Sequence, residues 1–199
     1  MAGVIPNGSV APEAMEAILT RGLAIPHESF VKLTDIIRVI DLPKGNLLFS
    51  AGKLERDIYF MVRGIARVYY HRGDHTTTLC FNSEGEVLIS LKSYIENQPG
   101  YENIELLEPS RLLQLKTGDL DKLYTSDIHV ANWGRRLAEQ ELIKTEERLM
   151  SKLFNTASER YRELMQKQPQ LLQRVQLGYI ASYLGISQVT LSRIRADIK

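Results

Sequence analysis

One segment of the sequence constrains the fold more than any other: residues 128–154 contain no proline and only one glycine, Gly134. At a rise of about 1.5 Å per residue, such a segment forms a helix about 40 Å long. Asp127 stands directly before it and is a suitable N-cap, because its carboxylate can accept hydrogen bonds from free N–H groups of the first turn. A helix of this length is too long to be a simple cap on a β-domain.

The apolar residues of this helix follow a heptad. Leu142 and Leu149 lie seven residues apart, and Ala138 and Thr145 occupy the intervening seam positions. Arg135 falls where a perfect zipper would have an apolar residue. Apolar a and d positions are typical of helices that pair with one another. We therefore predict a dimer seam, with the alternative that this stripe packs only on the chain's own β-domain.

Before residue 117 the sequence period changes. Apolar residues at helical spacing predict helices over residues 12–23 and 27–39, and a short helix over 119–124. Between residues 39 and 115, short β-branched or aromatic runs alternate with glycine- or proline-bearing breaks, which is typical of strands. The predicted strands are 39–42, 47–49, 58–62, 65–70, 76–81, 104–107 and 111–115. Strands spaced this closely predict an antiparallel barrel or sandwich.

Two of the breaks have the composition of hairpin turns. Arg63-Gly64 stands between the strands predicted at 58–62 and 65–70, and residues 70–75 form a second turn. Residues 1–12 are rich in Gly, Pro, Ala and Asn, and we expect them to be loose.

The charge of the chain is unevenly distributed. The whole sequence has 25 Lys and Arg against 24 Asp and Glu, a net charge of +1. Residues 152–199 contain eight basic and three acidic residues, a net charge of +5, so the remainder carries −4. A basic segment on an acidic body indicates contact with a polyanion. The alternative is a basic face that only water covers.

Composition excludes several classes of protein. No apolar run reaches the roughly 18 residues of a membrane span, and residues 1–12 lack the features of a secretory signal. A single cysteine, Cys80, excludes an intrachain disulfide and any cysteine-built zinc or iron–sulfur site. The single cysteine indicates a reducing, cytoplasmic setting. The four histidines have no metal-binding spacing, so we expect no metal site. No residues have the pattern of a catalytic site, so we do not expect an enzyme.

The pattern that carries the function lies near residue 185. Gly185 stands where a helix commonly ends with a left-handed residue, and Ser187 is suited to cap the helix that follows. Apolar residues at helical spacing on either side of this corner are Ile180, Ala181, Leu184, Leu191 and Ile194. Two short helices that cross at a glycine predict a helix-turn-helix, whose second helix enters the major groove of DNA.

Polar side chains of the second helix are the candidate DNA contacts. Arg193 can donate two hydrogen bonds to guanine, Gln188 can pair with adenine, and Val189 can only touch a thymine methyl group. Hydroxyls and terminal basic residues suit phosphates. The candidate DNA-binding residues are Ser187, Gln188, Val189, Thr190, Ser192, Arg193, Arg195 and Lys199.

A β-rich domain, one long helix and the pattern Leu-Gly-Ile-Ser…Leu-Ser-Arg-Ile over residues 184–194 resemble the cyclic-AMP receptor protein/FNR (Crp/Fnr) family of bacterial transcription regulators. Segments 42–45, 51–52 and 58–68 are similar to the strand–glycine–strand pattern of that family's nucleotide-binding β-roll. Residues 157–169 resemble the helix before its DNA reader, where we expect Arg160 to be structural.

The resemblance implies an α+β fold in three parts. Residues 1–127 would form a cyclic-nucleotide-binding-like β-roll (jelly-roll), 128–154 a dimerisation helix, and 155–199 a helix-turn-helix domain. It implies a homodimeric, sequence-specific regulator that binds an imperfect palindrome in double-stranded DNA, with RNA polymerase as a further partner and no membrane. The alternative is a ligand-binding or protein-interaction module whose helical tail no longer reads DNA.

The chain departs from the family at the nucleotide site. The family's Gly-Glu pair, which holds the ribose, falls on Ile89-Ser90, and its phosphate-binding Arg falls within residues 99–103, which have no basic residue. A buried phosphate without a cation is costly, so we do not expect cyclic AMP as the ligand. An unknown small-molecule effector remains open, as does a purely structural roll. The candidate effector-pocket residues are Tyr70, Phe81, Ser90 and Tyr101.

Two further departures concern the DNA reader. Family members usually continue past the second helix into a β-hairpin wing, and this sequence stops at Lys199, so either this branch lacks the wing or the chain is shortened. In either case we expect the backbone contacts of a wing to be missing. The family's base-reading Arg and Glu align with Gln188 and Val189, and only Arg193 matches. We therefore expect the target sequence to differ from the usual family site.

Overall fold

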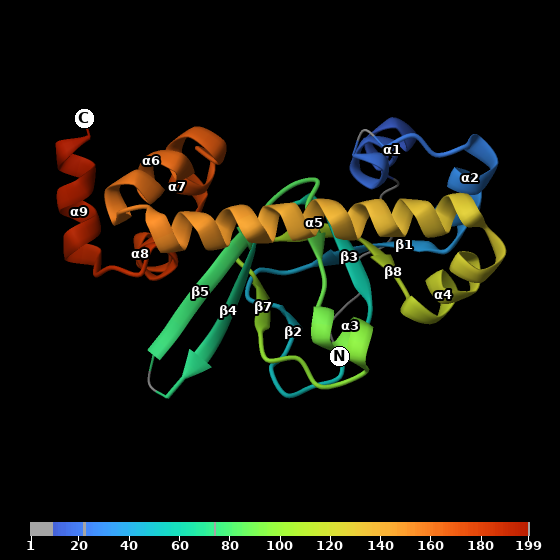
Figure 1. Cartoon of the computed structure of the whole chain (residues 1–199), viewed down its shortest axis with the longest axis horizontal. Coiled ribbons are helices and arrows are strands. Elements are labelled where there is room, and N and C mark those ends of the chain that lie inside the picture. The colour runs from blue at the N-terminus through green and yellow to red at the C-terminus, as the bar shows by residue number, and fades with distance from the viewer. Residues whose placement is uncertain (1–9, 22, 74, 199) are drawn as a thin grey trace. The chain divides into compact units, whose positions relative to one another are not determined.

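The computed structural model of the chain describes residues 10–21, 23–73 and 75–198. Residues 1–9, which belong to the segment predicted to be loose, lie outside the described residues. The chain divides into two compact units (Figure 1). The first comprises Met1–Val68 and Phe81–Ala138, and the second comprises Tyr69–Cys80 and Glu139–Lys199.

Eight strands form two antiparallel sheets of four strands each in the described chain. One sheet has the order β1-β8-β3-β6 and the other the order β2-β7-β4-β5. The strands are β1 (Ile37–Leu42), β2 (Leu47–Phe49), β3 (Ile58–Arg63), β4 (Ala66–Arg72), β5 (His75–Asn82), β6 (Val87–Leu88), β7 (Asn103–Leu106) and β8 (Ser110–Leu115). All seven predicted strands are present, within two residues at each end, and β6 was not predicted.

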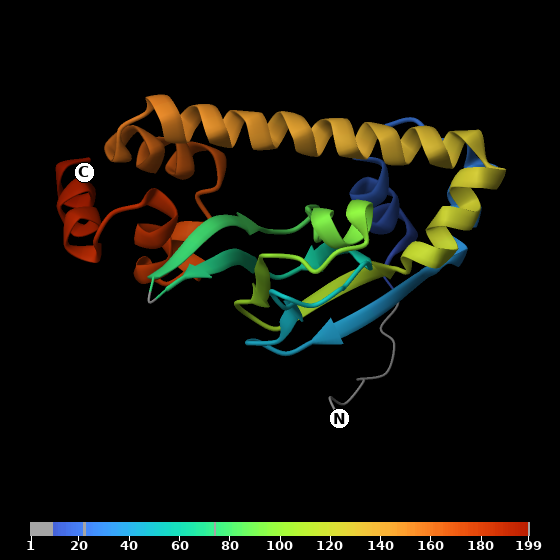
Figure 2. The ribbon, with the colours of Figure 1, turned by 60° about the horizontal axis from the view of Figure 1, so that its bottom comes forward.

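The hairpin predicted at Arg63-Gly64 is wrong, because β3 and β4 lie in different sheets. Gly64 instead takes the chain from one sheet to the other, at a φ of 127° that favours glycine. A Cβ atom at this position would lie 2.1 Å from Ser110 Oγ, so glycine is also required for space. The second predicted turn does join adjacent strands, β4 and β5, which form a long hairpin (Figure 2).

Apolar side chains from both sheets, from four short helices and from the beginning of the long helix build the core of the first unit. The short helices are α1 (Pro12–Thr20), α2 (His27–Asp35), α3 (Leu91–Glu96) and α4 (Thr117–Ser126). Helices α1, α2 and α4 were predicted with ends that differ by up to four residues, and α3 was not predicted. Across the first sheet, Arg111 of β8 donates two hydrogen bonds of 2.8 Å to Asp41 of β1, which lowers the pKa of that carboxyl.

Helix α5 (Ile128–Phe154) has the bounds that the sequence predicts. Its buried side chains, Val130, Trp133 and Leu137, all lie in the first ten residues, where they join the core of the first unit. The indole Nε1 of Trp133 donates a hydrogen bond of 2.8 Å to the carbonyl oxygen of Leu19 in α1. The beginning of α5 is therefore fixed by packing, whereas the rest of the helix buries no side chain.

Asp127 caps α5, as predicted. Its Oδ1 accepts hydrogen bonds from the N–H groups of His129 (3.0 Å) and Val130 (3.3 Å). The same carboxylate accepts from Ser29 Oγ (3.0 Å) and from Lys32 Nζ (2.9 Å) of α2. The hydrogen bond from the Lys32 ammonium, followed by those from Ser29 and the backbone, lowers the pKa of Asp127 to about 2.

The second unit contains four short helices after α5. These are α6 (Ala157–Lys167), α7 (Leu171–Arg174), α8 (Leu177–Leu184) and α9 (Gln188–Asp197). The N-cap of α6 is Thr156, which forms a reciprocal capping box with Glu159; the sequence had indicated a start at Ser158, through residue 168. Arg160 is structural in this arrangement: its guanidinium donates to the carbonyl oxygens of Asn155, at the end of α5, and of Leu184, at the end of α8.

The end of the β4–β5 hairpin belongs to the second unit, where it contacts α8. The hydroxyl of Ser182 accepts hydrogen bonds from the N–H (3.0 Å) and the hydroxyl (3.2 Å) of Thr78. It also donates to the carbonyl oxygen of Thr76 (3.0 Å). One serine side chain therefore ties the first helix of the predicted DNA reader to strand β5.

The cap at Asp127 gives a prediction about pH. Asp127→Asn keeps a capping oxygen but loses the charge that pairs with Lys32, so we expect a lower melting temperature at neutral pH. The folded pKa of about 2 lies below the unfolded value of about 3.9. The stabilisation is therefore complete above about pH 5 and disappears as the pH falls toward 2.

Thermal melts followed by circular dichroism from pH 7 to pH 2 would measure this difference. Asp119→Asn is the matched control, because Asp119 forms only an exposed pair with Lys122 and such pairs contribute little. A difference between wild type and Asp127→Asn that persists at pH 2, or that is absent at pH 7, would contradict the prediction.

Candidate nucleic-acid interface

The corner between α8 and α9 has the predicted geometry. Gly185 is left-handed, with a φ of 68°, and the N–H of Ile186 returns to the carbonyl oxygen of Ala181 at 3.0 Å. Ser187 caps α9 by accepting a hydrogen bond of 3.1 Å from the N–H of Thr190. These contacts satisfy backbone groups that a helix end would otherwise leave free. The turn between the two helices is therefore specified by its own sequence.

The inward face of the helix pair forms a small core. Its α8 residues are Ile180, Ala181 and Leu184, and its α9 residues are Leu191 and Ile194, all of them buried. Tyr161, Leu164, Leu171 and Val175 from the preceding helices are also buried. The five residues that the sequence placed on the apolar faces are thus those that the structure buries.

The opposite side of α9 is exposed. With about 100° between successive residues of a helix, Val189, Ser192, Arg193 and Ala196 lie opposite Leu191 and Ile194. All four are exposed, and Val189 has 62% of its surface accessible. Arg193 therefore lies on the exposed side of α9, beside Val189 and Ala196.

Gln188 and Thr190 lie at the two edges of that face. Thr190 is engaged at the helix start, where its hydroxyl lies 2.9 Å from Ser187 Oγ. Gln188 lies against α8: a Cβ atom on Gly178 would come within 2.5 Å of Gln188 Nε2. The absence of a side chain at Gly178 therefore makes room for Gln188. The remaining candidate, Lys199, lies outside the described residues.

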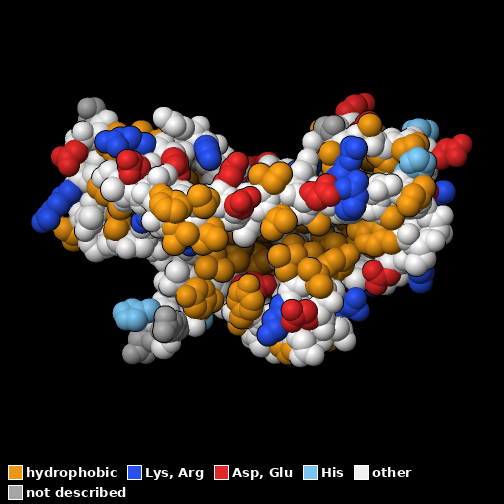
Figure 3. All heavy atoms as spheres, in the orientation of Figure 1, with side chains coloured by type: hydrophobic (Ala, Val, Ile, Leu, Met, Phe, Trp, Pro, Cys, Tyr) orange, Lys and Arg blue, Asp and Glu red, His pale blue; other side chains and the backbone are white. Residues whose placement is uncertain are grey.

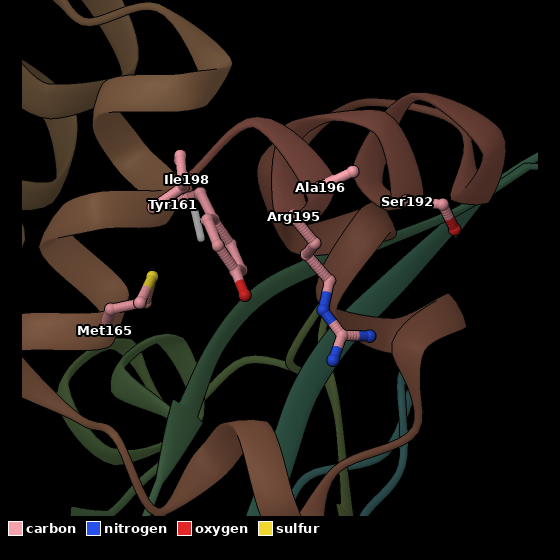
Figure 4. A pocket seen from close by; sticks show the side chains of 6 residues that line it. All are labelled: Tyr161, Met165, Ser192, Arg195, Ala196 and Ile198. Carbon is pink, nitrogen blue, oxygen red and sulfur yellow. The ribbon is translucent and has the colours of Figure 1, made fainter.

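Arg195 occupies a different surface from Arg193. It lines a shallow pocket of about 400 Å³ between α6 and α9 (Figure 4). Tyr161 and Met165 of α6 lie on one side of this pocket, and Ser192, Arg195 and Ala196 of α9 on the other. Arg195 is exposed and lies outside the face that contains Arg193.

The candidate effector residues are placed in different surroundings. Phe81 is buried in the first unit, and Ser90 is buried at the start of α3, where its hydroxyl donates to Ser93 Oγ at 3.3 Å. Tyr101 is 65% exposed. Tyr70 is partly buried and belongs to the second unit.

Glu102 belongs to residues 99–103, the segment without a basic residue, and its carboxylate would add to the cost of a buried phosphate there. Glu102 is buried, and its Oε2 accepts a hydrogen bond of 3.2 Å from the N–H of Tyr101. A Cβ atom on Gly100 would lie 2.5 Å from Ser90 Oγ and 3.5 Å from Glu102 Oε1, so both oxygens border the same point. The segment without a basic residue thus places a carboxylate beside Ser90.

The described part of the chain has neither a metal cluster nor a membrane-spanning helix. No three His, Cys, Asp or Glu side chains gather there in a way that could hold a metal ion. No helix among the same residues has the length and apolar content to cross a membrane.

Comparisons with known proteins show which fold the chain shares with them. Residues 39–127 match the family model of the cyclic nucleotide-binding domain. No curated protein sequence matches the chain significantly. Among solved structures, FixK2 from Bradyrhizobium japonicum aligns with a TM-score of 0.70 and 19% identity, over 82% of this chain and 84% of FixK2.

Two more solved structures extend the likeness. The catabolite activator protein of Thermus thermophilus is 24% identical, with a TM-score of 0.55 over 91% of this chain and 86% of its own. The c-di-GMP-responsive global regulator CLP of Xanthomonas campestris is 15% identical, with a TM-score of 0.65 over 87% of this chain and 91% of its own. By their names, one of these two proteins is an activator and the other a global regulator.

The predicted α+β fold is therefore confirmed. Residues 39–127 match the cyclic nucleotide-binding domain, and the chain, with its long helix and C-terminal helical region, has the fold of FixK2 and of the catabolite activator protein.

Proposed function

We propose that this chain is a homodimeric, sequence-specific DNA-binding transcription regulator whose recognition helix is α9. The observation that carries the proposal is the free side of α9, on which Arg193 projects opposite a buried apolar face. Arginine on such a face can donate two hydrogen bonds to guanine in the major groove. The net charge of +5 over residues 152–199 supports attraction to the DNA backbone.

The second half of α5 supports the homodimer. Leu142 and Leu149 are 68% and 55% exposed, so the chain's own core covers neither residue. Two copies paired along this seam would each present one recognition helix, and the two helices would reach successive major grooves about 34 Å apart. The target would be an imperfect palindrome.

We further propose that cyclic AMP is not the effector. The buried carboxylate of Glu102 and the hydroxyl of Ser90 border the region where the family resemblance implies a phosphate-binding arginine. A cyclic phosphate beside a buried carboxylate would be repelled, and a buried charge without a partner is costly. The identity of any effector, and RNA polymerase as a partner, stay predictions.

Selection of bound sites from randomised duplex DNA tests the function directly. We expect recovery of a palindrome with half-sites one helical turn apart. Recovery of no preferred sequence, with binding that disappears at moderate salt, would support the alternative module that does not read DNA.

The first variant tests the base contact. Arg193→Ala should weaken binding to the selected site by about 1–3 kcal/mol and relax the preference at one base step in each half-site. Arg195→Ala should instead weaken binding to every sequence alike and lower the salt slope by about one. Fluorescence anisotropy with DNA variants separates the two effects, and an unchanged base preference in Arg193→Ala would contradict the assignment.

The second variant tests the role of Gly178. Gly178→Ala should displace the Gln188 side chain and change the base preference at one position while the guanine preference assigned to Arg193 stays. Alanine in a helix interior is favoured over glycine by about 0.5–1 kcal/mol, so the protein should remain folded. Gly118→Ala in α4, where a Cβ meets open space, is the matched control. Identical preferences in both variants would contradict the prediction.

The third variant tests the dimer seam. Leu149 and Ile143 are almost equally exposed, at 55% and 56%, but only Leu149 occupies a seam position. Leu149→Asp should therefore shift the chain toward a monomer and weaken palindrome binding, whereas Ile143→Asp should leave a dimer. Sedimentation equilibrium measures both, and equal behaviour of the two variants would exclude this seam.

A further inference from the structure

Helix α5 has a second apolar face beside the seam. Ile143, Met150 and Phe154 are 56%, 49% and 71% exposed. With Leu142 and Leu149 at heptad position a, these residues take positions b, b and f, which point away from the partner in a two-stranded coiled coil. Pairing along the seam therefore leaves them uncovered. In Figure 3 hydrophobic side chains gather along α5.

Part of this second face lines a groove. Met150 and Phe154 of α5, together with Glu163 and Lys167 of α6, border a cavity of about 550 Å³. All of these residues belong to the second unit. An exposed apolar patch with a polar rim is the usual surface of an interaction site. We define these residues, with Glu146 and Glu147 at the same cavity, as the α5–α6 groove.

Hydrogen bonds between the end of α5 and α6 set the shape of the groove. Glu163 accepts hydrogen bonds from Ser151 Oγ (2.6 Å) and from Asn155 Nδ2 (2.5 Å), which hold α6 on the end of α5. Arg160 adds a hydrogen bond of 2.8 Å to the carbonyl oxygen of Asn155. Because these contacts fix the angle between the two helices, an incoming segment would not have to order the groove.

The charged side chains around the groove indicate which kind of partner can bind there. Glu146, Glu147 and Glu163 line it together with one cation, Lys167, whose Nζ lies 3.7 Å from Glu147 Oε2. The lining therefore has a net charge of −2. Such a surface repels DNA and anionic lipid and attracts a cationic partner. A cleft between two helices with apolar side chains on its wall fits the apolar face of a third helix.

We propose that the α5–α6 groove docks an amphipathic helix with a basic polar face, carried by a partner protein. Its apolar side chains would lie on Met150 and Phe154, and its lysines or arginines would face Glu146 and Glu147. The proposal goes beyond DNA binding, since the groove lies within one chain and does not require the dimer.

The test uses the full chain and three fluorescein-labelled helical peptides. One has leucine on one face and lysine on the other, the second has glutamate in place of lysine, and the third has serine in place of leucine. We expect fluorescence anisotropy to show binding of the leucine–lysine peptide, at least tenfold weaker binding of the other two, and weakening by added salt.

Two protein variants localise the binding. Phe154→Ser should weaken the leucine–lysine peptide at least tenfold, and Glu146→Lys should weaken it while improving the leucine–glutamate peptide. Ile95→Ser in α3 is the matched control, because Ile95 is also 71% exposed and lies outside the groove. Both exposed sites should tolerate serine without loss of folding.

Several results would overturn the proposal. These are no binding of the leucine–lysine peptide, equal binding of the lysine and glutamate peptides, or equal effects of Phe154→Ser and Ile95→Ser. Self-association beyond a dimer that Phe154→Ser abolishes would assign the groove to a second copy of this chain instead. Site selection with wild-type protein is a separate measurement, so failure of DNA binding and failure of docking are distinguishable.

Discussion

Helix α5 is buried in a core only at its beginning, and this difference along the helix determines which surfaces the rest of the fold must provide. Its first ten residues place Val130, Trp133 and Leu137 in a core, whereas the remainder of the helix buries no side chain of its own. Helices in proteins are stable mainly through packing of an apolar face, and intrinsic propensity contributes less. The second half of α5 therefore needs packing contacts with other apolar surfaces, and helix α6 provides only some of these contacts. Leu142 and Leu149 are exposed because these contacts do not cover them.

The sequence specifies those elements whose signals are local. The bounds of α5 follow from a long segment without proline and from Asp127, and the α8–α9 corner follows from Gly185 and Ser187. The capping hydrogen bonds from His129 and Val130 to Asp127, and from Thr190 to Ser187, join residues within three positions of one another, so a single stretch of sequence contains both caps. The outward position of Arg193 was predictable for the same reason, because the period of a helix fixes it.

Elements decided by distant contacts were not predictable in this way. Arg63-Gly64 has the composition of a hairpin, but the close approach of Ser110 and the pairing of β3 with β8 send the chain into the other sheet. Strand β6 has only two residues and α3 only six, too few to show a period. The contact of Ser182 with Thr78, and the space that Gly178 leaves for Gln188, depend on tertiary packing that no local pattern encodes.

The same junction supports both proposed surfaces. Asn155 receives Arg160 on its carbonyl oxygen and donates to Glu163 through its side chain, so the end of α5 and the first turns of α6 are fastened together. Arg160 continues to the carbonyl oxygen of Leu184, at the end of the helix that precedes the recognition helix. A segment lying in the α5–α6 groove would contact Asn155 and Glu163 directly. Arg160 therefore links the end of α5, beside the groove, to the end of α8, directly before the proposed recognition helix.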